Sequence, residues 1–339
     1  MSSSPSMQAA ILEAHGAPFR LASIPRPEPG PGEVLVRIHA SGINPLDLKI
    51  HAGAASHARH PLPAVLGLDL AGVVEAVGAG VTRFRPGDEV FGLTGGVGGH
   101  QGSLAEFAAV DADLLAPKPT NLTMREAASL PLVFITAWEG LVDRAGVSAG
   151  QKVLIHGGGG GVGRVAIQVA RACGAEVFAT GSEPRRAAVE QLGATFIDHR
   201  AGTVAEYVAR HTDGQGFDLV YDTAGGATLD ASFEAVRRFG HVVSALGWGT
   251  HALGPLSFRA ATYSGVFTLL PLLTGEGRAH HGAILEQAAR LAEAGKVVPL
   301  VDPRRYTLET VHDAYRDLEA QTAQGKLVVG IAEACQPIR

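Results

Sequence analysis

Five consecutive glycines occupy positions 157–161, and Gly158, Gly160 and Gly163 fit the spacing G-x-G-x-x-G. Between a strand and a helix, the first glycine of this pattern allows a tight turn. The second lets the backbone approach a diphosphate, and the third permits close helix–strand packing. The alternative is a slack linker that matches the pattern by chance. We interpret the run as a diphosphate-binding loop, because the segments on both sides and the repeating strands and helices after them agree with it.

The end of the next expected strand indicates which nucleotide the loop would take. A site for NAD usually ends this strand with an acidic residue that holds the ribose 2′-hydroxyl. Gly181 stands there instead, and Ser182, Arg185 and Arg186 follow, which could bind and neutralise a 2′-phosphate. Glu183 argues against this, since it could serve as the acid from one turn later, and the two arginines also suit a solvated helix start. The sequence favours NADPH.

Composition excludes several other classes of protein. The chain has 339 residues, of which 46% are hydrophobic and 18% charged, which predicts a globular protein of two domains. A net charge of -5 offers no basic field for nucleic acid. No apolar run is long enough to span a membrane, and no secretion signal is recognisable after an expected loose tail at 1–6. Two cysteines, Cys173 and Cys335, suit a reducing cytoplasm, where we expect the protein to reside.

The elements that must position the loop differ between the two halves of the chain. Up to about residue 120, short alternating runs separated by glycine and proline predict a β-rich domain; Val34, Val36 and Ile38 share one face of such a strand. Later, strands alternate with helices, which predicts a parallel sheet covered on both faces. Its expected strands are 152–156, 176–180, 195–198, 217–221 and 241–246, and its expected helices are 161–173, 184–192, 203–211 and 228–239.

Three further segments complete the expected order. Residues 262–270 suit a sixth strand at a sheet edge or a subunit interface, and 282–295 suit a helix that Gly295 ends. The final strand, helix and strand are expected to return to the first domain. The prediction is an α/β chain with a β-rich domain at 1–127 and 296–339 and a nucleotide-binding domain at 128–295.

Several stretches together resemble the medium-chain dehydrogenase/reductase superfamily, in its zinc-independent quinone oxidoreductase branch, which includes zeta-crystallin. They are "ASGINPLDLK", "VLGLDLAGVVEAVGAGV", "PGDEVFG", "AASLPLVFITAWEGL", "VLIHGGGGGVG" and "GKLVV". The resemblance covers nearly the whole chain. It implies a GroES-like catalytic domain, a Rossmann cofactor domain and an active cleft between them.

The resemblance also implies that no metal is used. Zinc alcohol dehydrogenases of this superfamily carry metal ligands where this chain has Asn44, Leu68 and Leu132. Asparagine is a poor Zn²⁺ ligand and leucine is none. A second possible metal group, His51, His57 and His60, lacks an accompanying carboxylate or thiol, and a solvent-exposed loop is the favoured interpretation.

Without zinc, the chemistry that remains is hydride transfer to electron-poor acceptors. Quinones and α,β-unsaturated carbonyls give a delocalised oxyanion that neutral hydrogen-bond donors can stabilise. In "INPLDLK", Asn44 can offer an amide N–H to a substrate oxygen or the cofactor ribose, and Asp47 can hold the loop or cap a helix. Lys49 stands where many relatives carry tyrosine. It could place a positive charge near an enolate, or be an ordinary surface lysine.

The same resemblance assigns contacts with NADPH. Gly160, Gly161 and Val162 would meet the diphosphate, and Ser182, Arg185 and His199 would surround the adenosine phosphate; Thr136, Leu246, Gly247, Thr268 and Leu269 would lie near the nicotinamide. The implied protein is an NADPH-dependent quinone or enone reductase, a homodimer paired through the sixth strand. The alternatives are a 2-alkenal or enoyl reductase of the same fold, or an NADPH-binding protein with little turnover.

Overall fold

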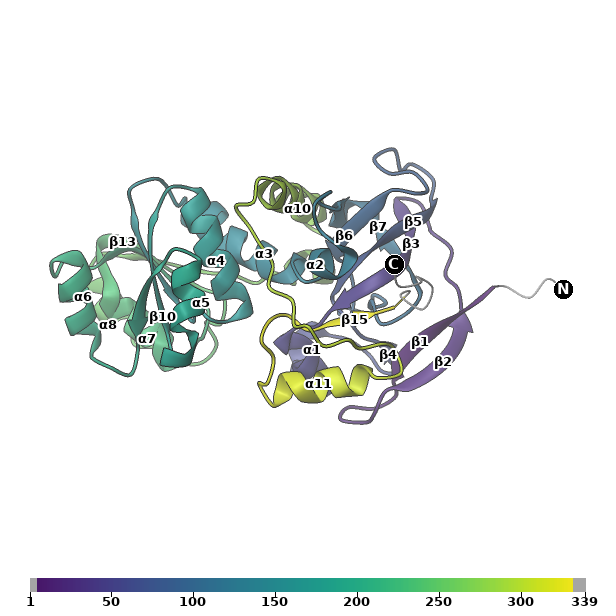
Figure 1. Ribbon diagram of the computed structural model, residues 1–339, viewed down its shortest axis with the longest axis horizontal. Coiled ribbons are helices and arrows are strands. Elements are labelled where there is room, and N and C mark those ends of the chain that lie inside the picture. Colours follow the sequence, from purple (N-terminus) through teal and green to yellow (C-terminus); the bar gives the residue numbers. More distant parts are fainter. Residues whose placement is uncertain (1–4, 332–339) are drawn as a thin grey trace. The chain divides into compact units, whose positions relative to one another are not determined.

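The computed structural model describes residues 5–331 and divides them into two compact units (Figure 1). Among the described residues, one unit combines 5–132 with 269–331, and the other is 133–268. The expected division placed 269–295 with the nucleotide-binding domain, whereas these residues belong to the first unit. The reason is packing: Gly282 lies so close to the carbonyl of Asp113 that an added Cβ would sit 2.5 Å from its oxygen. Residues 1–4 of the expected tail, and Cys335, lie outside the described residues, and Ser6 already begins a strand.

The second unit is built on a six-stranded sheet in the order β11-β10-β9-β12-β13-β14, with every neighbouring pair parallel. Its chain order reverses between β9 and β12, and ligands bind at such a point in doubly wound sheets. The bounds are β9 (Lys152–His156), β10 (Glu176–Gly181), β11 (Thr195–Asp198), β12 (Phe217–Asp222), β13 (Val236–Ser244) and β14 (Thr262–Gly265). This is the Rossmann-type sheet that the alternating pattern predicts.

Helices lie on both sides of this sheet (Figure 1). They are α4 (Gly161–Ala172), the 3₁₀ turn η4 (Glu183–Arg185), α5 (Arg186–Gln191), α6 (Val204–Thr212), α7 (Ala227–Ala235) and α8 (Gly254–Ser257). Before them come α3 (Pro131–Trp138), which spans the division between the units, and the π-helix η3 (Glu139–Arg144). The expected helix 228–239 ends early, because residues 236–239 join β13. The expected sixth strand is shorter than predicted, since β14 stops at Gly265.

The first unit contains two sheets of mainly antiparallel strands. A three-stranded sheet has the order β2-β1-β4, and a larger sheet has the order β15-β3-β5-β6-β8, with β7 also paired to β3. The bounds are β1 (Ser6–Leu12), β2 (Arg20–Pro25), β3 (Glu33–Gly42), β4 (Ala64–Val65), β5 (Asp69–Val77), β6 (Glu89–Leu93), β7 (Phe107–Asp111), β8 (Leu115–Pro117) and β15 (Val328–Gly330). Val34, Val36 and Ile38 are fully buried, as their alternation predicts. This is the expected β-rich domain.

Helices and 3₁₀ turns complete the first unit. They are α1 (Pro45–His51), the 3₁₀ turns η1 (Ser56–Ala58) and η2 (Ala112–Leu114), α2 (Met124–Ala128), α9 (Leu270–Thr274), α10 (Arg278–Glu293) and α11 (Val311–Glu319). Helix α10 confirms the helix expected at 282–295; it buries Ile284 and Ala288 and packs on β8. Gly295 follows it with a φ of 66°, a left-handed conformation that suits glycine after a helix.

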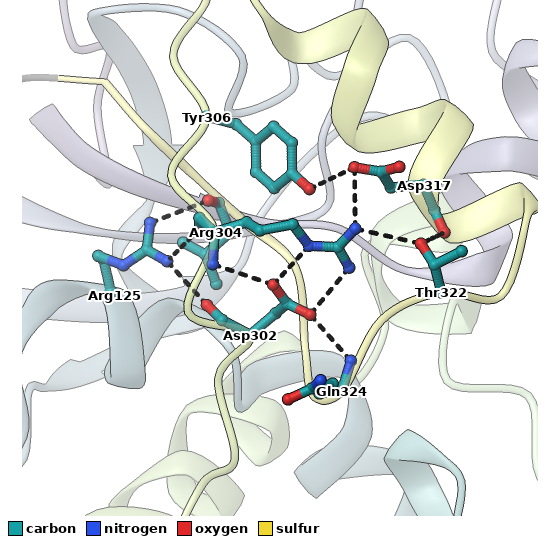
Figure 2. Close-up of polar contacts among 8 residues, drawn as sticks. Arg125, Asp302, Arg304, Tyr306, Asp317, Thr322 and Gln324 are labelled. Carbon is teal, nitrogen blue, oxygen red and sulfur yellow. Dashed lines mark hydrogen bonds and ion pairs between the residues drawn. The ribbon is translucent and has the colours of Figure 1, made fainter.

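A polar network fastens the last part of the chain, residues 301–330, to the rest of the first unit (Figure 2). Asp302 accepts two hydrogen bonds from the guanidinium of Arg304 (2.8 and 2.9 Å), and Arg304 also pairs with Asp317 (3.0 Å). The buried Arg125 of α2 donates to the carbonyls of Asp302 and Val328. Hydrogen bonding to Arg304 lowers the pKa of Asp302 to about 2, so this carboxylate stays ionised in all but strong acid.

Candidate functional site

The glycine loop turns at Gly157, one residue earlier than the G-x-G-x-x-G pattern indicates. Gly157 has a φ of 77°, and Gly158 does not share that left-handed conformation. The amide of Gly157 donates a hydrogen bond to the Thr180 hydroxyl (3.3 Å), and the amide of Gly158 donates to the Thr180 carbonyl (2.9 Å). The tight turn that we assigned to Gly158 therefore belongs to Gly157, and Gly158 serves another purpose.

That purpose is close packing. A Cβ on Gly158 would lie 2.7 Å from the Cβ of Ala179 in β10, and one on Gly163 would lie 2.2 Å from the carbonyl oxygen of Gly157. Gly160 caps α4, and within residues 5–331 no side-chain cap hydrogen bond is made at this helix start, whose first turn includes Gly161 and Val162. A loop without side chains at a helix N-terminus fits a diphosphate.

A buried histidine stabilises the glycine loop through Thr180. His156, the last residue of β9, is 3% exposed, and its Nδ1 lies 3.0 Å from the Thr180 hydroxyl. Burial lowers the pKa of His156 to about 4, so it is neutral at physiological pH. Because Thr180 also receives the Gly157 amide, these groups tie the turn to the end of β10.

Gly181 and the three residues expected around the adenosine phosphate lie at or just after the ends of β10 and β11. Gly181 ends β10, and its carbonyl accepts a hydrogen bond from His199 Nδ1 (2.8 Å), which places this exposed side chain beside it. Ser182 follows, and its carbonyl accepts from the amide of Arg185 (2.8 Å). The Arg185 side chain continues toward the glycine loop, where it lies against Gly159.

Glu183, the residue that argued for NAD, is engaged elsewhere. Both of its carboxylate oxygens accept hydrogen bonds from Arg186, at 2.7 and 2.9 Å. Hydrogen bonding to Arg186 lowers the pKa of Glu183. The guanidinium of Arg186 also stacks on Phe196 (4.4 Å). Arg186 is thus bound to protein groups and does not join Arg185, contrary to one option that the sequence left open.

Two threonines expected near the nicotinamide meet in the second unit. The hydroxyls of Thr136 and Thr268 are 3.0 Å apart, and Thr268 donates to the carboxylate of Glu139 (3.0 Å). In the contact between the two threonines, either hydroxyl can be the donor. Tyr221 donates to the carbonyl of Thr136 (2.6 Å) and fixes this turn of α3.

Leu246 and Gly247 lie just after β13, next to the loop that follows β12. The carboxylate of Asp222 organises both loops, because it accepts hydrogen bonds from the Ser244 hydroxyl (2.7 Å) and from the amide of Gly225 (2.9 Å). A Cβ on Gly225 would lie 2.7 Å from the Leu246 carbonyl oxygen. These loops leave the carboxyl ends of the strands, where a doubly wound sheet binds its ligand. Leu269 is buried and belongs to the first unit.

In the first unit, Asn44 is held on both sides of its amide. Its Nδ2 donates to Asp69 (2.9 Å), and its Oδ1 accepts from Lys326, which also donates to the carbonyl of Ile43 (2.9 Å). Asn44 has no exposed surface. These contacts assign Asn44 to the interior rather than to a substrate oxygen, which differs from our expectation.

Asp47 and Asp69 complete this buried cluster. Asp47 caps the start of α1 by accepting from the amide of Asn44 (2.8 Å), and its other oxygen, Oδ1, has no hydrogen-bond partner among the residues that the structure describes. Burial raises the pKa of Asp47 to about 7 and that of Asp69 to about 6, and it lowers the pKa of Lys326. The cluster therefore depends on one ammonium to balance two buried carboxyls.

The neighbouring loop carries the remaining candidates. Lys49 is exposed on α1. His51 lies 2.9 Å from the carbonyl of Ala17, and His60 receives the amide of Gly99, so these two rings have separate protein partners. His60 also lines a cavity of about 440 Å³ with Ile50, Ala55, Ala58, Pro61, His15, Gly53, Ser56 and Arg59.

The positions at which zinc dehydrogenases hold their metal carry other groups here. Asp69 accepts from the amide of Leu132 (2.9 Å) as well as from Asn44, and Leu68 is buried in the core. Among residues 5–331, no three histidine, cysteine or acidic side chains are placed to share a metal ion. The donor set does not fit zinc.

Sequence reasoning missed Lys326, Asp69, Glu139 and Asp222, which hold the candidate residues in place. A buried charged residue that contacts residues far away in the sequence produces no periodic pattern from which it could be predicted. Lys326 does lie in "GKLVV", one of the stretches that carry the resemblance.

Comparisons with known proteins agree with this architecture. Residues 30–120 match the family model described as an alcohol dehydrogenase GroES-like domain, and residues 192–329 match the one described as zinc-binding dehydrogenase. The 2-methylene-furan-3-one reductase of Solanum lycopersicum is 36% identical over 307 residues, covering 88% of this chain and 71% of that protein. The chain belongs to the medium-chain dehydrogenase/reductase superfamily.

Similar solved structures indicate the branch of the superfamily to which the chain belongs. A crystal structure of an alcohol dehydrogenase superfamily protein from Novosphingobium aromaticivorans has 60% identity and a TM-score of 0.94, covering 96% of this chain and 99% of that one. A mycobacterial quinone oxidoreductase has 29% identity and a TM-score of 0.84, covering 96% and 100%. The chain therefore lies in the quinone oxidoreductase-like branch, and it is an oxidoreductase with a GroES-like and a Rossmann-type unit.

Several of the curated relatives are much longer than this chain, which spans about 13–15% of their length. The match to the spectinabilin polyketide synthase system protein NorB of Streptomyces orinoci has 36% identity and covers 91% of this chain but only 13% of that protein. The chain thus spans a small part of NorB, and nothing of NorB's own activity transfers with the match. Among the described helices, none has the length and apolar character to cross a membrane.

Proposed function

We propose that this chain is an NADPH-dependent reductase that transfers hydride to quinones or α,β-unsaturated carbonyl compounds without zinc. The observation that carries the choice of cofactor is the pairing of Glu183 with Arg186. It occupies the acid that could hold a ribose hydroxyl and leaves Arg185 beside the glycine loop. NADPH, when bound, supplies the hydride.

The contribution of the protein is to bind, orient and polarise. The glycine loop and the first turn of α4 hold the diphosphate, and the linked hydroxyls of Thr136 and Thr268 fix one wall of the nicotinamide site. Quinones and enones suit a site of this kind, because hydride addition to them gives a delocalised oxyanion that needs no Lewis acid. Lys49 is the proposed cation for that oxyanion, since it is exposed and Asn44 is not.

A specific observation keeps the 2-alkenal or enoyl reductase alternative open. The tomato relative is named for 2-methylene-furan-3-one, a compound whose exocyclic double bond is conjugated to a ketone. An enone acceptor is therefore as well supported as a quinone, and both take hydride by the same chemistry.

Turnover should be measured with purified protein as loss of NADPH absorbance with 1,4-benzoquinone, 9,10-phenanthrenequinone and 1-octen-3-one. We expect turnover with at least one acceptor, and NADPH to bind about tenfold or more tighter than NADH. Lys49→Met should lower kcat/KM; an unchanged value removes Lys49 from the mechanism. Tight NADPH binding with no turnover on any acceptor would instead favour a binding protein.

Zinc independence has its own control. Activity should survive dialysis against EDTA, because the donor set around Asn44 and Asp69 is occupied by protein hydrogen bonds. Stoichiometric zinc by elemental analysis, together with loss of activity on chelation, would contradict the proposal.

We also propose a homodimer paired through β14. This strand is at the edge of the sheet, where its neighbour among the described strands is β13 alone. Large apolar side chains near it are exposed, including Phe258 (88%) and Phe239 (77%). An unpaired edge with exposed apolar groups is suited to pairing with a second copy.

Phe258→Glu should convert the dimer to a monomer, because it places a charge in an interface that must exclude water. Light scattering coupled to gel filtration gives the mass of the species. Leu21→Glu, at an exposed residue of β2 in the other unit, is the matched control and should leave the mass unchanged. A monomeric wild-type protein would reject the dimer.

A further inference from the structure

Two arginines beside the glycine loop lack an acidic partner. Arg164 lies in the second turn of α4, directly after Gly163, and is partly buried. Arg185 is exposed, and its Cβ, Cγ and Cδ lie 3.0 to 3.3 Å from where a Cβ on Gly159 would stand. Within residues 5–331, neither guanidinium makes a hydrogen bond or an ion pair.

Unpaired like charges are unfavourable unless an anion joins them. Burial lowers the pKa of Arg164, and the positive charge of Arg185 lowers it further. The neighbouring Arg186 differs, because Glu183 neutralises it. An anion bound between Arg164 and Arg185 would remove their repulsion and gain two charge-assisted contacts.

The geometry points to Arg164 as a specificity-determining residue that binds the nucleotide 2′-phosphate together with Arg185. This inference rests on the proposed use of NADPH. Arg185 starts from the end of β10, where the second strand of a Rossmann unit meets the adenosine ribose. The aliphatic part of its side chain lies against Gly159 of the glycine loop, and α4, which begins two residues after Gly159, carries Arg164. The diphosphate already has the free N–H groups of the helix's first turn.

Calorimetric titration with two probes separates the phosphates. The probe 2′,5′-ADP carries a 2′-phosphate and no diphosphate, whereas ADP carries a diphosphate and no 2′-phosphate. Arg164→Met should raise the Kd for 2′,5′-ADP and for NADPH about tenfold or more, and change the Kd for ADP and NADH less than about twofold. The matched control is Arg171→Met in the last turn of the same helix, which makes the same change in net charge. It should leave the Kd values for all four ligands unchanged.

Each outcome has one meaning. An equal loss of affinity for ADP and 2′,5′-ADP would overturn the assignment to the 2′-phosphate, and no loss for either would overturn any role of Arg164 in binding. Arg164→Lys keeps the positive charge but loses the two-pronged hydrogen bonding of the guanidinium, so it should give an intermediate Kd for 2′,5′-ADP. This variant replaces Arg164→Met as the test if the latter does not fold. If wild-type protein binds NADPH and NADH equally, the proposed cofactor preference itself fails, whatever Arg164 does.

Discussion

Gly163→Ala is expected to weaken NADPH binding by more than about 30-fold, a loss of roughly 2 kcal/mol. The added Cβ would lie 2.2 Å from the carbonyl oxygen of Gly157 and 2.9 Å from the Cα of Gly158. Both neighbours are backbone, so no side chain can rotate away, and the loop must move from its place over the start of α4. Fluorescence titration of NADPH measures the loss.

Two other glycines make the result specific. Gly160→Ala needs a shift of only a few tenths of an ångström, because its Cβ would lie 3.3 Å from the Gly157 carbonyl oxygen. It should keep the melting temperature of the free protein and still weaken NADPH binding, since the diphosphate must come close to this residue. Gly214→Ala, at an open position with a φ of 77°, should lower the melting temperature slightly and leave the Kd unchanged. If Gly163→Ala and Gly160→Ala both bind NADPH normally, the run is a linker.

Lys326→Met is expected to destabilise the protein by about 3–5 kcal/mol, because removing one partner leaves buried charge without compensation. Asp69 has no exposed surface and lies 3.9 Å from the Lys326 ammonium, which also donates to Asn44 and to the carbonyl of Ile43. Urea unfolding measures the loss. The control Arg316→Met breaks a surface pair with Asp313 and should cost less than about 1 kcal/mol.

The loss should depend on pH in a stated direction. Burial raises the pKa of Asp47 and Asp69, and the charge of Lys326 opposes that rise. Without the lysine, both values rise further, so the folded variant binds more protons than the unfolded chain and becomes less stable as pH increases above about 4. The difference from wild type should therefore be smaller at pH 5 than at pH 8. Adding Asp69→Asn to Lys326→Met should recover part of the loss at pH 8. An equal loss at both pH values would mean that the lysine acts by packing.

Local patterns predicted much of the second unit. The expected bounds of β9 and β11 agree with the structure, because a buried parallel strand is a short apolar run between turn residues. The helix before β13 was predicted too long, since residues 236–239 also fit a helical period. Pairing of β13 with β12 overrides that local preference, and Phe239 adopts a φ of 59° where the strand is irregular.

The site was predicted less completely, for a different reason. The spacing of glycines identifies a loop but not its register, so the tight turn falls on Gly157. Ser182, Arg185 and His199 meet because neighbouring parallel strands end at the same edge, which a sequence pattern can indicate. The contact of Asn44 with Lys326 joins residues 282 positions apart, and only the folded sheet brings them together.

The second unit, 133–268, is one continuous stretch, whereas the first needs segments from before and after it. During synthesis the Rossmann-type sheet can complete itself while β3 still lacks β15, and Asn44 and Asp69 have no cation until Lys326 emerges. The part of the first unit that is synthesised early therefore cannot complete its fold until residues 269–331 are made. Until then, the carboxyl groups of Asp47 and Asp69 lack the ammonium of Lys326. Folding on the ribosome should proceed from the middle of the chain outward.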